Sequence, residues 1–160
     1  MRQLPGHLDD DDGAGGARLA TALLDLLTVA VAAEVDRRSA VPPDARRRAR
    51  LGRIYASIDA RLGDPDLTPA TIAATHHISV RYLHLLFETE QHSVADLIRT
   101  RRLEHCRRDL LDPTLADRPV AATGVRWGFP NTAHFSRLFR DTYGLPPSEF
   151  RRQFGQPTRP

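Results

Sequence analysis

Residues 123–139 read TGVRWGFPNTAHFSRLF, and residues 72–87 read IAATHHISVRYLHLLF. Each stretch holds a short first segment, a turn, a residue suited to capping a helix (Asn131 or Ser79) and a second segment that ends in Leu-Phe. A short helix, a tight turn and a second helix make a helix-turn-helix unit, whose second helix enters the major groove of DNA. The duplication therefore predicts two such units, with two recognition helices, in one chain.

The residue types at matching positions support this prediction. The first helix needs a small residue where it touches the second, and Ala73 and Gly124 stand there. The apolar positions of the second helices are Leu83, Leu86 and Phe87 in the first copy and Phe135, Leu138 and Phe139 in the second. The remaining face, free for base edges, holds Arg81, Tyr82, His84 and Leu85 in the first copy and Thr132, Ala133, Ser136 and Arg137, with Arg140 near the end, in the second.

The rest of the chain also has helical patterns, so we expect an all-α fold. Leucine and alanine recur at helical spacing over residues 17–38, and residues 46–62 show a second apolar face. Thr68-Pro69 predicts a helix start, and Ser93, with Asp96 three residues on, predicts a long helix over residues 93–111. This helix would span about 28 Å, compared with about 34 Å between successive major-groove faces of DNA, which suits a rod linking the two units.

These elements divide the chain into parts. The acidic, glycine-rich residues 1–16 are expected to form a disordered lead, and residues 17–44 a helix and a linker. The two helix-turn-helix units, at about 68–90 and 119–143, fall with the long helix inside one domain over residues 45–155. Residues 156–160 are then a tail.

The charge distribution fits a polyanionic partner. Residues 1–36 hold two Arg and seven Asp or Glu, a net charge of −5, whereas residues 37–160 hold 21 Arg and 13 Asp or Glu, a net charge of +8. A well-solvated arginine-rich surface is the alternative explanation. The sequence shows no signal peptide and no membrane-spanning stretch, and its one cysteine excludes an internal disulfide, so we expect a soluble cytoplasmic protein.

The sequence predicts neither a catalytic site nor a metal site. It has no Ser-His-Asp triad, phosphate-binding loop or paired carboxylate motif, so we do not expect an enzyme. A structural zinc site needs about four converging ligands, but His76 and His77 lie at the first turn, near His84, whereas His105 and Cys106 lie on a separate helix. We therefore expect no metal and no cofactor, and the Cys106 side chain is expected to pack in the interior.

The most specific stretch is WGFPNTAHFSRLFR at residues 127–140, followed by YGLPPSEFR at residues 143–151. It resembles the signature of the AraC/XylS family of transcriptional regulators: Gly-Phe, a spacer, Phe-Ser-Arg-x-Phe, and a proline followed by proline or serine before a final Arg. Residues 98–103, IRTRRL, resemble the start of the family's linker helix. The resemblance covers about residues 50–154 and indicates the family's C-terminal domain, which has two helix-turn-helix units.

The resemblance implies a bacterial sequence-specific transcription regulator, usually an activator, with double-stranded DNA and RNA polymerase as partners. The family's base-reading positions correspond to Arg81, His84, Leu85, Thr132, Ser136 and Arg137. Arginine can form paired hydrogen bonds with guanine, whereas leucine offers only apolar contact, for example to a thymine methyl group. Phosphate contacts are expected from Arg99, Arg101, Arg102 and Arg140, with a solvated surface charge as the alternative for each.

The sequence departs from the family in two places. Thr123-Gly124 stands where members usually have Ile-Ala, and glycine inside a helix costs about 1 kcal/mol relative to alanine, so the second copy is expected to be the less stable. Most members also carry an N-terminal sensor domain, often a cupin-like β-barrel. Residues 1–50 are too few for one and resemble only the helical end of a sensor or dimerisation domain with its linker. A truncated product, a mis-assigned start and a natural short form stay open, and no ligand pocket is expected.

The apolar stripe of residues 17–38 needs a partner, because one helix cannot bury it alone. It either folds back on the rest of the chain or pairs with a second copy, which makes a homodimer one expectation. This leaves a second class of function open: an all-α interaction module that does not bind DNA and modulates a full-length regulator through residues 17–38.

Overall fold

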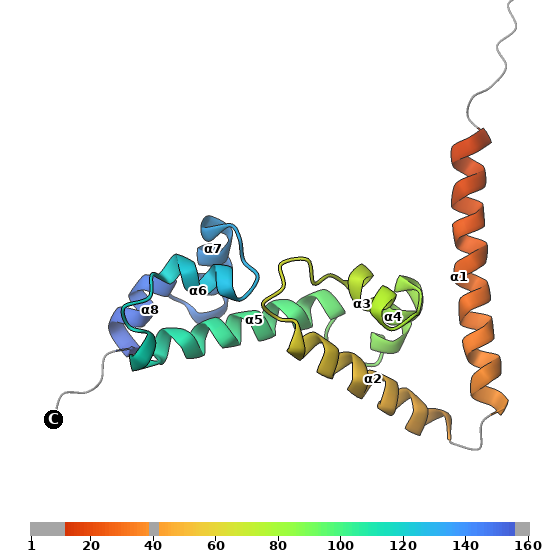
Figure 1. Ribbon diagram of the computed structural model, residues 1–160, viewed down its shortest axis with the longest axis horizontal. Coiled ribbons are helices and arrows are strands. Elements are labelled where there is room, and N and C mark those ends of the chain that lie inside the picture. Colours follow the sequence, from red (N-terminus) through yellow and green to blue (C-terminus); the bar gives the residue numbers. More distant parts are fainter. Residues whose placement is uncertain (1–11, 39–41, 156–160) are drawn as a thin grey trace, which may run out of the picture. The chain divides into compact units, whose positions relative to one another are not determined.

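The computed structural model describes residues 12–38 and 42–155, and within these ranges it is helical with no strand, as expected (Figure 1). The elements in chain order are α1 (Asp12–Arg38), α2 (Pro43–Ala60), α3 (Pro69–Thr75), α4 (Val80–Phe87), α5 (Val94–Leu111), the short 3₁₀ helix η1 (Pro113–Leu115), α6 (Val120–Arg126), α7 (Thr132–Tyr143) and α8 (Pro147–Phe154).

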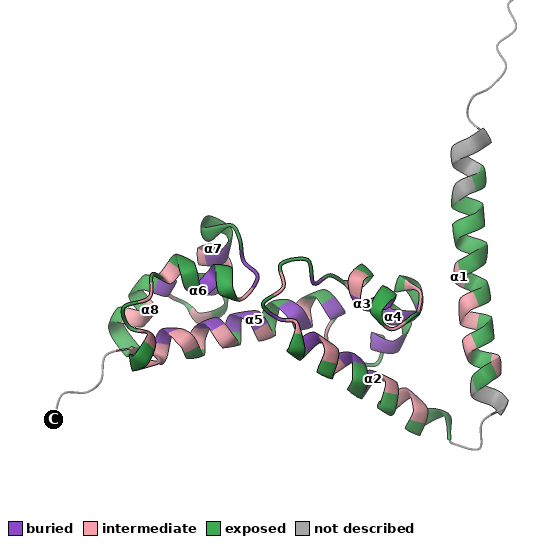
Figure 2. Ribbon diagram, viewed as in Figure 1, coloured by how far each residue is buried: buried purple, intermediate pink, exposed green. Residues whose placement is uncertain are grey.

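Contacts divide the chain into two compact parts, with the boundary between Arg46 and Arg47. The N-terminal part contains α1, whose described side chains are all exposed or half-buried (Figure 2). Its large apolar residues are 55–67% exposed; they are Leu19, Leu23, Leu24, Leu26, Leu27, Val31 and Val35. No helix in the part of the chain that the structure describes is long and apolar enough to cross a membrane.

Side-chain caps start four of the α-helices, at the residues that the sequence indicates. Thr68 Oγ1 accepts a hydrogen bond from the Thr71 N–H at 3.2 Å, and the Thr71 hydroxyl accepts one from the Thr68 N–H in return. Ser79, Ser93 and Asn131 each accept from the main-chain N–H three residues on. These caps satisfy amide groups that have no partner inside the helix, which explains why the helix starts were predictable.

Several boundaries differ from the sequence expectation. α1 begins at Asp12 instead of residue 17, because adding a residue to an existing helix gains a hydrogen bond without a new nucleation step. The predicted disordered lead therefore fails for residues 12–16, whereas residues 1–11 and the tail at 156–160 lie outside the described residues. α2 begins at Pro43, since proline is favourable in the first turn of a helix.

Two sets of buried side chains flank the central helix α5. Leu51, Ile54 and Ile58 of α2 are buried together with apolar residues of α3, of α4 and of the first turns of α5. At the other end of α5, a cluster forms from Leu103, Cys106, Leu110, Phe129, Phe135 and Phe139. The α3–α4 pair and the α6–α7 pair thus lie at opposite ends of one continuous helix (Figure 1).

Candidate nucleic-acid interface

The two helix-turn-helix units share the same main-chain turn. In the first, the Ile78 N–H donates to the Ala73 carbonyl at 3.0 Å, and His77 between them has φ +52°. In the second, the Phe129 N–H donates to the Gly124 carbonyl at 2.9 Å, and Gly128 takes the same place with φ +76°. In the second unit one additional residue, Pro130, separates Phe129 from the capping residue Asn131, whereas Ile78 directly precedes the capping residue Ser79. The turn geometry therefore repeats, and the repeat read from the sequence is structural.

The small residues lie where the first helix of each unit meets the second. Ala73 is buried, and a Cβ added to Gly124 would lie 2.8 Å from Cδ1 of Phe135. A side chain at position 124 would therefore press on a ring in the core, so glycine is required there by packing even though it weakens the isolated helix.

Thr123, beside Gly124, has a position that suits an apolar residue better. Its side chain is 1% exposed, and its hydroxyl oxygen has no hydrogen-bond partner in the described part of the chain. The equivalent residue of the first copy is Ile72, which is fully buried. A buried hydroxyl without a partner loses its hydration without compensation, which agrees with a weaker first helix in the second copy.

The first recognition helix, α4, presents a narrower face than its sequence suggests. Arg81, His84 and Leu85 are exposed. Tyr82 is buried instead: its hydroxyl accepts a hydrogen bond from Arg50 at 2.9 Å, and the Arg50 guanidinium lies 5.5 Å from the ring centre. Tyr82 therefore fixes α4 against α2, and the prediction that it lies on the face free for base edges was wrong.

The second recognition helix, α7, exposes Thr132 and Arg137 and leaves Ser136 half-buried. Phe135 and Phe139 on its opposite side are fully buried. All six expected base-reading residues thus lie on the outer side of α4 or α7, and none is part of the buried core.

The four arginines expected at phosphates have different surroundings. Arg99 is exposed and paired with Asp96, and Arg140 is exposed with its nearest carboxylate, on Asp141, 4.0 Å away. Arg101 is half-buried, paired with Asp59 and placed 5.5 Å from the ring centre of Tyr55. Of these three, Arg99 and Arg140 have the guanidinium most open to solvent.

The structure corrects the expectation that Arg102 contacts a phosphate, because its side chain is buried and not on the surface. Its guanidinium donates hydrogen bonds to the main-chain carbonyls of Leu62 at 2.9 Å, of Asp64 at 2.5 Å and of Gly128 at 3.1 Å. Burial lowers the pKa of this group below its usual value. Each of its three nitrogen atoms already donates a hydrogen bond inside the protein, so Arg102 is not among the proposed phosphate contacts.

The sequence also did not indicate a cavity of about 310 Å³ between the two helix-turn-helix units. It is lined by Thr68 at the start of α3, by Ile98 and Arg99 of α5, by Phe129 of the turn between α6 and α7, and by His134 of α7. Residues this far apart in the chain give no common sequence pattern, so the cavity had no signal in the sequence.

His105 is half-buried and Cys106 is buried. Burial raises the pKa of the Cys106 thiol to about 12, and the buried side chain lies against the Thr123 carbonyl. Burial also lowers the pKa of His105, whose ring stacks on Trp127 at 4.1 Å between centres. Among the residues that the structure describes, no three His, Cys, Asp or Glu side chains are placed to share a metal ion.

Residues 72–153, which run from within α3 to within α8, match a protein family described as a helix-turn-helix domain, and this domain is of the AraC type. The chain belongs to the AraC/XylS family. The match includes α4, α5 and α7, so the recognition helices and their linker all lie in the region that defines the family.

Relatives and solved structures agree with this membership. The transcriptional activator NphR of a Rhodococcus species is 35% identical over 134 residues, which is 84% of this chain and 38% of NphR. The C-terminal domain of AraT, a response regulator from Geobacillus stearothermophilus, has a TM-score of 0.64 and 23% identity, covering 76% of this chain and 94% of that one. The DNA-binding domain of AdpA, solved with a target DNA, has a TM-score of 0.58 and 21% identity, covering 65% and 91%.

The two structural likenesses establish the shared fold. The chain spans well under half the length of the curated relatives that it matches, 38% for NphR and 28% for the regulatory protein HrpB of Ralstonia nicotianae.

Proposed function

We propose that this chain is a sequence-specific DNA-binding transcription regulator that places α4 and α7 in successive segments of one major groove. The observation that supports this most strongly is the repeated turn: two units with the same main-chain geometry present exposed polar residues from opposite ends of one helix. The domain that performs this function is proposed to span residues 45–155, preceded by the helix and linker of residues 17–44.

The proposed base contacts come from Arg81, His84 and Leu85 of α4 and from Thr132, Ser136 and Arg137 of α7. Arg81 and Arg137 suit guanine, whose O6 and N7 match a guanidinium in geometry. Arg99 and Arg140 are proposed as phosphate contacts because both are exposed. Arg101 is a further phosphate candidate if it exchanges its pairing with Asp59 for DNA.

The regulator is proposed to act as an activator, as the name of NphR suggests, with RNA polymerase as its second partner and the bacterial cytoplasm as its location. It is not proposed to be an enzyme or to need a cofactor. Residues 17–38 are proposed to form a homodimer, since seven large apolar side chains of α1 are more than half exposed.

The same exposed stripe supports a second candidate function. In that case the chain pairs through α1 with a full-length regulator and modulates it without binding DNA itself. Sedimentation of the intact chain and of a chain that starts at Pro42 tests the role of α1. A monomer in both cases contradicts the homodimer.

DNA binding separates the two functions directly. The intact chain is used to select duplexes from a random library, and its affinity is then measured by fluorescence anisotropy on a selected duplex and on a scrambled duplex of equal composition. The proposed function predicts tight, salt-sensitive binding to the selected duplex only, because phosphate contacts release counterions and base contacts supply the selectivity. Equal or absent binding to both duplexes would overturn it and favour the interaction module.

A further inference from the structure

Arg102 lies in the middle of α5, the helix that links the two helix-turn-helix units. Its three hydrogen bonds go to main-chain carbonyls on two sides: those of Leu62 and Asp64 in the loop after α2, and that of Gly128 in the turn of the second unit. One side chain therefore joins the linker helix to the surroundings of both units.

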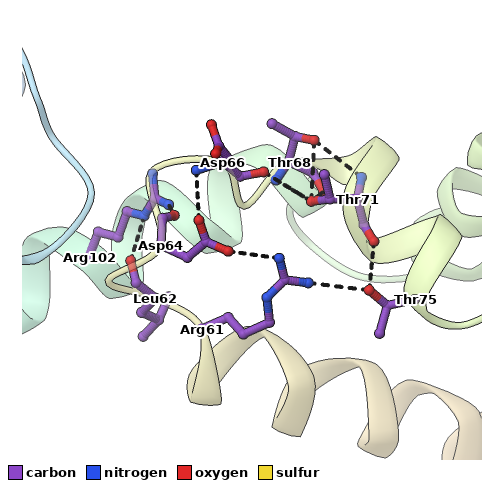
Figure 3. Close-up of polar contacts among 8 residues, drawn as sticks. All are labelled: Arg61, Leu62, Asp64, Asp66, Thr68, Thr71, Thr75 and Arg102. Atoms are coloured by element: carbon purple, nitrogen blue, oxygen red, sulfur yellow. Dashed lines mark hydrogen bonds and ion pairs between the residues drawn. The ribbon is translucent and has the colours of Figure 1, made fainter.

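The loop that Arg102 holds is fixed to the first unit (Figure 3). The Asp64 carboxylate pairs with Arg61 at 2.7 Å, and Arg61 also donates to the Thr75 hydroxyl at 3.2 Å, at the end of α3. On the other side of the loop, the Thr71 hydroxyl donates to the Asp66 carbonyl at 3.1 Å. The loop and α3 are thus joined at both ends of that helix.

Close backbone contacts fix the second unit in the same place. A Cβ added to Gly128 would lie 2.6 Å from the guanidinium carbon of Arg102, and one added to Gly63 would lie 2.8 Å from the carbonyl oxygen of Arg126. The loop after α2 therefore touches the end of α6 directly, and neither glycine leaves room for a side chain. The two units cannot shift past each other without breaking these contacts.

Arginine suits this place because of its shape and its charge. The carbonyls of Leu62 and Asp64 follow α2 and that of Gly128 follows α6, and the C-terminal end of a helix carries partial negative charge that favours a cation. The planar guanidinium offers five donors in a fixed fan, whereas the lysine ammonium is a single compact charge on a flexible stem. Removing the guanidinium takes this donor from the carbonyl oxygens of Leu62 and Gly128 at buried sites, whereas the Asp64 carbonyl keeps its hydrogen bond from the Leu67 N–H at 3.1 Å.

We propose that Arg102 is a positioning residue that sets the separation and orientation of the two recognition helices. It thereby sets the spacing that the protein accepts between its two half-sites, the DNA segments that α4 and α7 contact. This inference rests on the proposed function. One extra base pair moves the second half-site by about 3.4 Å and turns it by about 34°. A rigid junction at Arg102 excludes that displaced site, whereas a loosened junction accepts it.

The first test measures the geometry without DNA. Spin labels are placed on Glu88→Cys in the first unit and Asp141→Cys in the second, both exposed positions, and the distribution of distances between them is recorded in the intact chain. The native thiol of Cys106 stays unlabelled, because it is buried and its pKa is raised to about 12. Arg102→Met is expected to widen the distribution, and Arg102→Lys to widen it less.

Asp64→Asn and Arg108→Met complete this experiment. Asp64→Asn weakens the pairing with Arg61 at a partly exposed site and is expected to give a smaller widening, which keeps the test valid if Arg102→Met loses its helical circular dichroism. Arg108→Met removes an exposed arginine from the same helix and is expected to change nothing. An unchanged distribution in the folded Arg102 and Asp64 variants overturns the proposal.

The second test measures half-site spacing. The affinity of the wild-type chain for its selected duplex is compared with that for duplexes one base pair longer or shorter between the half-sites. Arg102→Met is expected to lower the ratio of these affinities several-fold, toward a value of one. The base preference within each half-site is expected to stay the same. An equally sharp spacing preference contradicts the role of Arg102. If the wild-type chain selects no sequence, the proposed function fails, whereas the spin-label distances still report on Arg102.

Discussion

The two helix-turn-helix units form the same turn from different residues. The first has His77 in a left-handed conformation, Ala73 at the contact between its helices and Ile72 in the core; the second has Gly128, Gly124 and Thr123 at these positions. The second unit is packed around aromatic rings, with Phe135 5.5 Å from Phe129 and 5.8 Å from Phe139 between ring centres. The comparison shows that the backbone of the motif is maintained while each unit adjusts its small residues to what packs on it.

The largest expected difference between the units concerns the left-handed residue of the turn. Gly128→Ala should destabilise the protein by about 2–4 kcal/mol, because a side chain adds left-handed strain and presses on Arg102. His77→Gly should change stability by less than about 1 kcal/mol, since relief of strain and added freedom of the unfolded chain oppose each other. Urea denaturation followed by circular dichroism measures both. Losses of equal size would show that the two turns are equivalent after all.

DNA affinity tests whether both units read bases. Arg81→Ala and Arg137→Ala should each weaken binding to the selected duplex by about 1–3 kcal/mol and relax the preference at one base pair. Arg108→Ala, which removes the same charge from a position outside both recognition helices, is the matched control. An equal loss on scrambled DNA would mean that the two arginines contact only phosphates.

Opposite substitutions at the helix contact should both destabilise the protein. Gly124→Ala should lower stability by about 1–2 kcal/mol, because crowding of the Phe135 ring outweighs the gain in helix propensity. Ala73→Gly should lower it by about 2 kcal/mol, because it lowers the helix propensity and also removes a buried methyl group. Thermal and urea unfolding of the two variants give the values. A stabilised Gly124→Ala would mean that the ring moves aside without cost.

The smallest expected effect is a gain in stability. Thr123→Val replaces a buried hydroxyl that has no partner among the described residues with a methyl group of similar size, and should stabilise the second unit by about 1 kcal/mol. This change makes the second unit more like the first, where Ile72 occupies the position. A loss of stability in urea unfolding would reveal a hydrogen bond to the Thr123 hydroxyl.

The local features of the fold were predictable because they depend on neighbouring residues. Ser79 and Asn131 cap the recognition helices by bonding amides three residues away, so the sequence alone places both turns. The spacing of Phe135 and Phe139 likewise identifies the buried side of α7 and, by difference, its exposed side.

The long-range features were not predictable for the same reason. Arg102 looks like other arginines of the linker helix in sequence, and its partners are carbonyl groups 26 to 40 positions away, which no pattern of side chains reveals. Tyr82 was placed on the reading face because its partner, Arg50, lies on a different helix. The positions of partners across the fold decide whether such amphipathic side chains are buried.

Hydroxyl-radical footprinting of the intact chain on its selected duplex tests the central claim most directly. If α4 and α7 enter successive segments of one major groove, the footprint should show two protected segments on one face of the DNA, about one helical turn apart. Arg81→Ala should weaken one segment and Arg137→Ala the other. A single protected segment, or protection that does not depend on the sequence of the duplex, would contradict the account.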